Sequence, residues 1–192
     1  MEKIGTLTSR FALIASLTLI PVAMIGQTNS MSASSSNASL SSSDKKFVRE
    51  AAQGGMAEVE LGKLATEKAS SPEVKKFGQR MVNDHSKANE QLKEVASSQG
   101  ITLPSNLSAK DEMTKEHLSK LSGEQFDKAY MSDMVKDHTQ DVADFQQEAN
   151  SASDPAVKEF AEKTLPVLKS HLREARQIAP TTSASASKML GE

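Results

Sequence analysis

The chain has 192 residues, 37% of them hydrophobic and 25% charged, which suffices for one domain or at most two small ones. Its formal net charge of −2 excludes the strongly basic profile of a general nucleic-acid-binding protein. Cysteine is absent, which excludes disulfides, thiolate nucleophiles, cysteine-ligated zinc, iron–sulfur clusters and covalently attached c-type haem. With aromatic residues at only 4%, the composition favours helix over sheet.

The first 26 residues have the pattern of an export signal. Lys3 and Arg10 precede an uncharged, mostly apolar run, FALIASLTLIPVAMIG. This run is shorter than the roughly 20 apolar residues of a membrane-spanning helix, so it resembles the core of a signal peptide. A retained membrane anchor is the alternative interpretation. No cysteine follows the run, so attachment as a lipoprotein is excluded.

The rest of the chain divides into a spacer, a folded domain and a tail. Residues 27–43 are rich in serine and cannot bury enough apolar surface to become ordered, so we expect a disordered spacer. The folded domain is predicted to span residues 44–178. Residues 179–192 have the same polar, small-residue character as the spacer and are predicted to form a disordered tail.

Five helical segments and no strands are predicted within the folded domain, because no stretch alternates with a period of two. They cover residues 44–69, 72–98, 108–121, 124–150 and 155–178, with Asp44 as a candidate N-cap. The connector between the second and the fourth segment is long enough to run back along the domain. The prediction is therefore a ferritin-like four-helix bundle with a short extra helix in its crossover. A plain up-and-down bundle with an elaborated loop is the alternative.

An internal repeat relates the two halves of the domain. The segment SPEVKKF at 71–77 matches DPAVKEF at 154–160, and each begins the second helix of a predicted hairpin. Phe47 and Phe126 occupy similar places in the preceding helices. The shared pattern after the proline indicates a duplicated helical hairpin.

Each long helix carries one ionisable residue in its apolar register: Glu58, His85, His138 and His171. An ionisable group on an apolar face costs several kcal/mol unless it is paired, neutralised or bound to a metal. Three imidazoles and one carboxylate suit a divalent transition-metal ion, so the pattern predicts a mononuclear metal site in the core. The alternative is a metal-free hydrogen-bond network in a non-enzymatic structural or stress-related envelope protein.

Other residues near the histidines are candidate alternative ligands or hydrogen-bond partners of the imidazoles. Met81 and Met134 each stand four residues before a histidine, on the same helix face, and thioethers favour Cu(I). Asp84 and Asp137 directly precede His85 and His138, and Glu174 follows His171 by three positions. Haem held between histidine and methionine is a third interpretation, which the scarcity of aromatics disfavours. No sequence motif identifies a reaction or a substrate.

Three stretches of residues 44–178 carry a family resemblance. They are FVREAAQGGMAEVELGKLATEKASSPEVKKFGQRMVNDHSKANEQL, FDKAYMSDMVKDH and KTLPVLKSHLREA. They resemble an exported bacterial family of unknown function in the ferritin-like superfamily, whose members are often labelled predicted outer membrane proteins. The resemblance implies a four-helix ferritin-like fold, no established activity, and a place in the periplasm or cell envelope, with outer-membrane association as one option.

The di-iron members of that superfamily use Glu-x-x-His pairs, and this chain departs from the pattern. Val82, Val135 and Leu168 stand three residues before His85, His138 and His171. None of these three apolar side chains is a ligand. Di-iron carboxylate chemistry is therefore not transferred to this chain, and a mononuclear, histidine-rich site is the expectation.

Overall fold

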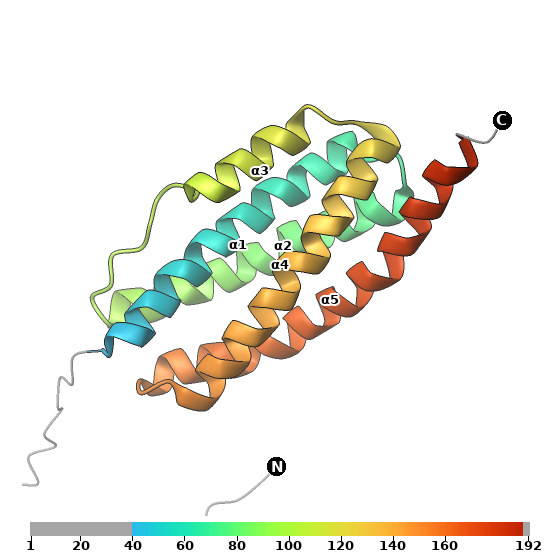
Figure 1. Ribbon diagram of the computed structural model, residues 1–192. Coiled ribbons are helices and arrows are strands. Elements are labelled where there is room, and N and C mark those ends of the chain that lie inside the picture. Colours follow the sequence, from blue (N-terminus) through green and yellow to red (C-terminus); the bar gives the residue numbers. More distant parts are fainter. Residues whose placement is uncertain (1–39, 190–192) are drawn as a thin grey trace, which may run out of the picture. The chain divides into compact units, whose positions relative to one another are not determined.

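A computed structural model describes the backbone of residues 40–189 and the side chains of residues 40–179. The predicted export signal and most of the predicted spacer lie outside the described residues. The described part of the chain forms five helices and no strand, which confirms the all-helical prediction (Figure 1). The helices are α1 (Ser42–Lys68), α2 (Pro72–Ser98), α3 (Ala109–Ser119), α4 (Gly123–Ser151) and α5 (Pro155–Met189). None of these described helices has the length and apolar character needed to cross a membrane.

The outer ends of the helical region differ from the sequence-based expectation. The helix α1 begins at Ser42 because Ser41, rather than Asp44, is the N-cap: its hydroxyl oxygen accepts the backbone N–H of Asp44 at 3.0 Å. At the other end, α5 continues to Met189 through most of the predicted tail.

Two buried aspartates tie the helical hairpins together at opposite ends. Asp127, near the start of α4, accepts the backbone N–H groups of Ser70 and Ser71 at 3.1 and 2.9 Å. Asp44, near the start of α1, accepts two backbone N–H groups of the α4–α5 turn at 3.2 and 2.9 Å. The start of α4 therefore lies beside the end of α1, and the start of α1 lies beside the end of α4. It follows that α1 and α4 are antiparallel and that α2 and α4 run in the same direction.

These two ties support the predicted duplication and set its register. Asp44 and Asp127 are separated by 83 positions, as are residues 71 and 154 of the two turns that they bind. The same separation pairs Phe47 with Tyr130, whereas the sequence alone suggested Phe126 as its counterpart. In each hairpin, an aspartate near the start of the first helix accepts backbone N–H groups from the turn of the other hairpin.

The buried apolar residues form two clusters, one towards each end of the long helices. One cluster contains Phe47 and Phe145, whose ring centroids are 4.9 Å apart. The other contains Phe77 and Tyr130, whose ring centroids are 6.3 Å apart. Each of the four long helices contributes to both clusters, so each must pass through the layer between them.

The helices α1 and α2 approach each other closely at a pair of glycines. A Cβ atom added at Gly78 would lie 2.6 Å from Cβ of Ala65 and 2.9 Å from the carbonyl oxygen of Gly62. Both distances are shorter than a Cβ atom tolerates in a non-bonded contact, and the second is to a backbone atom, which no side-chain rotation can move away. This spacing therefore requires glycine at position 78.

We predict that Gly78→Ala destabilises the fold by about 1–3 kcal/mol, because the overpacking outweighs the gain in helix propensity. Gly54→Ala is the matched control, since a Cβ atom there meets nothing within 4 Å. We expect that control to raise stability by roughly 0.5–1 kcal/mol. Urea unfolding followed by circular dichroism measures both. Equal effects of the two substitutions would contradict the close approach.

Candidate metal centre

A layer of ionisable side chains separates the two apolar clusters. Glu58 of α1, His85 of α2, His138 of α4 and His171 of α5 have exposed fractions of only 4%, 7%, 0% and 0%. In every helix the residue stands between positions that belong to one cluster and positions that belong to the other. The four residues selected from the apolar register therefore lie in the core at one depth.

The three imidazoles converge. The ring centroids of His85 and His138 are 5.7 Å apart, those of His85 and His171 are 5.4 Å apart, and those of His138 and His171 are 5.3 Å apart. One ligand atom from each ring lies within 4.8 Å of the other two. Nitrogen ligands of a tetrahedral ion are about 3.3 Å apart, given metal–nitrogen bonds of about 2.0–2.1 Å. Small side-chain movements would bring the rings to that spacing.

Each of these rings has one buried nitrogen without a hydrogen-bond partner: Nε2 of His85, Nε2 of His138 and Nδ1 of His171. In two of the rings the other nitrogen is engaged. Nδ1–H of His138 donates to the carbonyl oxygen of Met134 at 3.0 Å, and Nε2–H of His171 donates to Oδ2 of Asp84 at 2.7 Å. These contacts fix the tautomers, so the unpartnered nitrogens of His138 and His171 carry free lone pairs.

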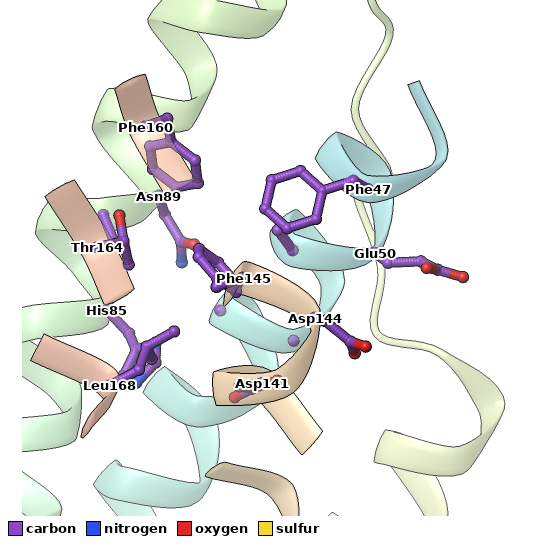
Figure 2. A pocket seen from close by; sticks show the side chains of 14 residues that line it. Phe47, Glu50, His85, Asn89, Asp141, Asp144, Phe145, Phe160, Thr164 and Leu168 are labelled. Atoms are coloured by element: carbon purple, nitrogen blue, oxygen red, sulfur yellow. The ribbon is translucent and has the colours of Figure 1, made fainter. Parts of the chain in front are cut away.

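His85 also lines a cavity of about 90 Å³ between α1, α2, α4 and α5 (Figure 2). Asp141 of α4 lines the same cavity. The cavity lies on the side of the centre that faces the cluster of Phe47 and Phe145, both of which contribute to its wall. The imidazole layer is therefore accessible to a small occupant from this side.

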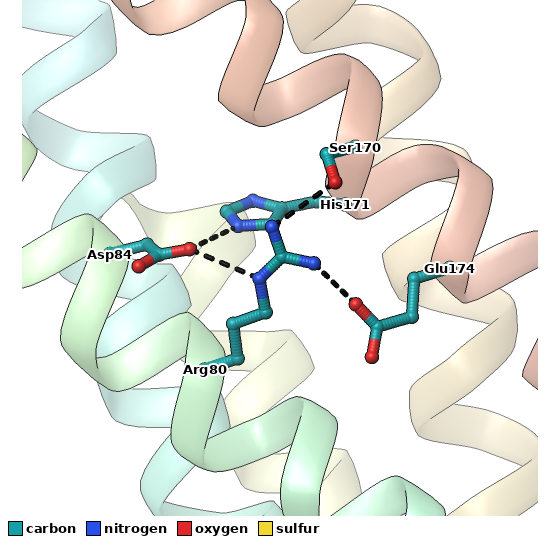
Figure 3. Close-up of polar contacts among 5 residues, drawn as sticks. All are labelled: Arg80, Asp84, Ser170, His171 and Glu174. Atoms are coloured by element: carbon teal, nitrogen blue, oxygen red, sulfur yellow. Dashed lines mark hydrogen bonds and ion pairs between the residues drawn. The ribbon is translucent and has the colours of Figure 1, made fainter.

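An ion-pair network fixes the orientation of His171 from the outside of the bundle (Figure 3). Asp84, which accepts the imidazole N–H, also accepts Nε–H of Arg80 at 3.2 Å. Arg80 donates to the carboxylate of Glu174 and, at 3.2 Å, to the hydroxyl of Ser170. Asp84 therefore accepts a hydrogen bond from an imidazole on a neighbouring helix. Arg80 was not among the candidate residues selected from the sequence; its spacing of four residues from Asp84 was the available signal.

The carboxylate of Glu58 lies beside His138 rather than at the centre of the three rings. Its Oε1 atom is 3.7 Å from Nδ1 of His138, and its Oε2 atom has no hydrogen-bond partner. Glu58, His138 and Asp141 each have one potential ligand atom within 4.8 Å of the other two. The predicted four-residue set therefore divides into the imidazole triad and Glu58, which groups with His138 and with Asp141, a residue outside the predicted set.

The remaining predicted residues lie around this centre in different roles. Asp137 pairs with Nζ of Lys110 on α3 at 3.3 Å and makes no described contact with an imidazole. Glu174 contacts Arg80 and not His171. Met81 and Met134 are fully buried in the apolar cluster of Phe77, where they serve as core residues.

Burial keeps the histidines neutral. Desolvation lowers the pKa of His85 well below its ordinary value, lowers that of His171, and lowers that of His138 to about 3. Desolvation also raises the pKa of Glu58 well above its usual range and that of Asp141 to about 7, the latter with help from the charges of Asp137 and Asp144. At neutral pH the three rings therefore present lone pairs rather than protons.

We predict a pH-dependent effect of Asp141→Asn in the metal-free protein. With its pKa raised from 3.8 to about 7, the Asp141 carboxyl keeps its proton in the folded state at pH values where the unfolded chain has lost it. Stability contributed at low pH is therefore lost as pH rises through this window. The asparagine variant stays neutral, so its free energy of unfolding relative to wild type should rise by up to about 1.4 kcal/mol per pH unit and then level off.

Urea unfolding in the presence of a chelator, at pH values below, within and above this window, measures the difference. Glu94→Gln is the control, because it removes a carboxylate from an exposed position on α2. A flat difference for Asp141→Asn would contradict the burial of a protonated carboxyl at this position.

Comparison with known proteins identifies a family and a fold. The structure is similar to that of a DUF305 fragment from Deinococcus radiodurans, with a TM-score of 0.66, 15% identity, and 74% of this chain and 98% of that chain covered. It is also similar to a candidate secreted DUF305 protein from Streptomyces coelicolor, with a TM-score of 0.64, 13% identity, and 73% and 92% covered. At these identities the similarity shows the fold alone.

No curated protein matches the chain. The family comparison matches residues 29–178 to a domain of unknown function, DUF4142. This match spans most of the chain and includes every residue of the imidazole layer. The chain therefore belongs to the DUF4142 family.

Proposed function

We propose that this protein is exported and binds one transition-metal ion through the imidazoles of His85, His138 and His171. The observation that supports the proposal is the convergence of three buried rings, each with one nitrogen that lacks a hydrogen-bond partner. Leaving a buried polar atom unpaired costs about 1–3 kcal/mol, and a single ion would satisfy all three atoms at once.

The donor set indicates the kind of metal. Neutral imidazole nitrogens suit zinc, copper, iron and nickel, whereas calcium and magnesium prefer oxygen ligands. Ligating imidazoles commonly donate their second N–H to a carbonyl or a carboxylate, as His138 does to Met134 and His171 does to Asp84. Glu58 faces the Nδ1 side of His138, so we assign it to positioning that ring rather than to a fourth ligand position.

The ferritin-like arrangement and the export of the protein belong to this proposal. The common direction of α2 and α4 requires the connector 99–122 to return along the bundle, and α3 within it packs against α1. That return supports the proposal of a ferritin-like four-helix bundle with a single crossover. Export to the periplasm or cell envelope is supported by the basic start and apolar run of residues 1–26, and the similar Streptomyces protein is described as a candidate secreted protein.

We predict stoichiometric uptake of Co²⁺ or Zn²⁺ by the full chain purified without a histidine tag. Metal at a hundredfold excess over its Kd should stabilise the fold by about 2.7 kcal/mol. His138→Ala should abolish this stabilisation, whereas His117→Ala should retain it, because His117 is exposed on α3. Elemental analysis and thermal melting with and without metal measure the effect.

Asp84→Asn separates a positioning role from a merely structural one. It keeps the side-chain shape but weakens the contact that orients His171, so metal affinity should fall by about 10–100-fold while stoichiometry is retained. Absence of bound metal, together with melting unchanged by Co²⁺, Zn²⁺, Cu²⁺ and Mn²⁺, would contradict the proposal. That result would favour the alternative of a buried hydrogen-bond network completed by water.

A further inference from the structure

The cavity beside the imidazole layer has a polar inner end and an acidic outer end. His85 and Asp141 form its inner polar lining, and Asn89 and Thr164 add an amide and a hydroxyl. At the outer end stand Glu50 and Asp144, which are exposed; Figure 2 shows both pointing away from His85. The cavity therefore connects carboxylates at the surface with the buried centre.

His85 provides the link between the cavity and the centre. The side chain is only 7% exposed, it lines the cavity, and its Nε2 atom has no hydrogen-bond partner. Asp141 provides a second link, since its carboxylate lies within 4.8 Å of a ligand atom of His138. A cation in the cavity would thus meet a carboxylate and an unpartnered imidazole before it reached the other two rings.

The space exists because one hairpin has small residues where the other has imidazoles. At the separation of 83 positions that relates the hairpins, Gly55 corresponds to His138 and Ala88 corresponds to His171. Gly55 and Ala88 both line the cavity. The absence of a side chain at Gly55 also lets Asn89 lie against the backbone of α1, since a Cβ atom would come within 2.0 Å of its Oδ1.

The charge of the lining favours cations. Three of the lining residues, Glu50, Asp141 and Asp144, are acidic, and no lysine or arginine is among the residues that line this cavity. Lys46, which does not line the cavity, pairs with the Glu50 carboxylate at 3.1 Å on the exposed surface, so this carboxylate already has a basic partner at the opening. Carboxylates around a narrow opening raise the local concentration of cations and speed their association.

We propose that this cavity is the route by which a metal cation reaches and leaves the imidazole triad, with the carboxylates of Glu50 and Asp144 collecting the cation and Asp141 passing it to His85. The inference rests on the proposed metal site. It adds a kinetic role for residues that do not hold the bound ion. A route through which both association and dissociation occur must alter both rates equally when it is obstructed.

Gly54 offers the sharpest obstruction. It lines the cavity, and a Cβ atom there meets nothing within 4 Å, so this position accepts a side chain and Gly54→Leu adds bulk at the cavity wall. Gly54→Ala is the matched control, because it makes the same change in helix propensity with little added bulk. Metal-free full chain is mixed with Co²⁺ alone in a stopped-flow instrument, and the visible absorption of the bound ion is followed.

We expect Gly54→Leu to slow both the association and the dissociation of Co²⁺ by about tenfold and to leave Kd unchanged. Gly54→Ala should retain the wild-type rates. A changed Kd with an unchanged association rate would overturn the route, because it would show that the substitution acts on the bound state.

The surface carboxylates are tested independently by the pair Glu50→Gln and Asp144→Asn. We expect about a tenfold slower association at low salt and a weaker dependence of the rate on ionic strength. The pair Glu90→Gln and Glu94→Gln is the control: it makes the same change in net charge on exposed residues of α2 that do not line this cavity. This second pair keeps the proposal testable even if Gly54→Leu does not fold.

The outcomes separate the route from the site. A wild-type chain that binds Co²⁺ at equilibrium, but whose rates are unaffected by Gly54→Leu and by the Glu50 and Asp144 substitutions, overturns the route and leaves the metal site intact. A wild-type chain that binds no Co²⁺ at equilibrium contradicts the site and the route together. Slower rates confined to the cavity variants, with Kd retained, support the route.

Discussion

The desolvation of one layer of ionisable side chains in the middle of the helices is the constraint on which the rest of the structure depends. Glu58 and the three imidazoles divide the apolar core into two clusters, and all four side chains are buried. Burial disfavours the charged form of each group, so it lowers the pKa values of the histidines and raises that of Glu58. What burial leaves behind is a set of uncharged nitrogen donors, which is the protonation state that a metal requires.

Keeping these groups at one depth requires the helices to be fixed along their axes. Asp44 and Asp127 do this from opposite ends, because each binds the backbone of the turn that belongs to the other hairpin. A shift of either hairpin would break charge-assisted hydrogen bonds in a buried setting, where they are among the stronger polar contacts. The same contacts make α2 and α4 run in the same direction. The hydrogen bonds of Asp44 and Asp127 at the helix ends thus hold the ionisable residues of the central layer at one depth.

Comparison of the two hairpins explains why imidazoles and a cavity lie on different sides of the centre. At the common register the two hairpins share an acidic residue, Glu58 in one and Asp141 in the other, yet their imidazoles do not correspond. His138 and His171 fill the centre from the second hairpin, and Gly55 and Ala88 leave space at the equivalent places in the first. A symmetric pair of hairpins with imidazoles at all these positions would have no room for the cavity. Divergence of the repeat therefore creates both a donor set and an opening beside it.

The sequence by itself determined the elements and the depth of the polar residues. Apolar spacing and the absence of period-two alternation predict five helices close to those observed, and the same spacing selects Glu58, His85, His138 and His171 as core residues. Only the tertiary structure decided which of these meet. Helix periodicity reports the face on which a residue lies but not the rotation and shift between helices. Hence the separation of Glu58 from the triad, the pairing of Arg80 with Glu174 and the cavity could not be read from spacing. Those features depend on the contacts of Asp44 and Asp127, which join residues about a hundred or about sixty positions apart, beyond the reach of any local pattern.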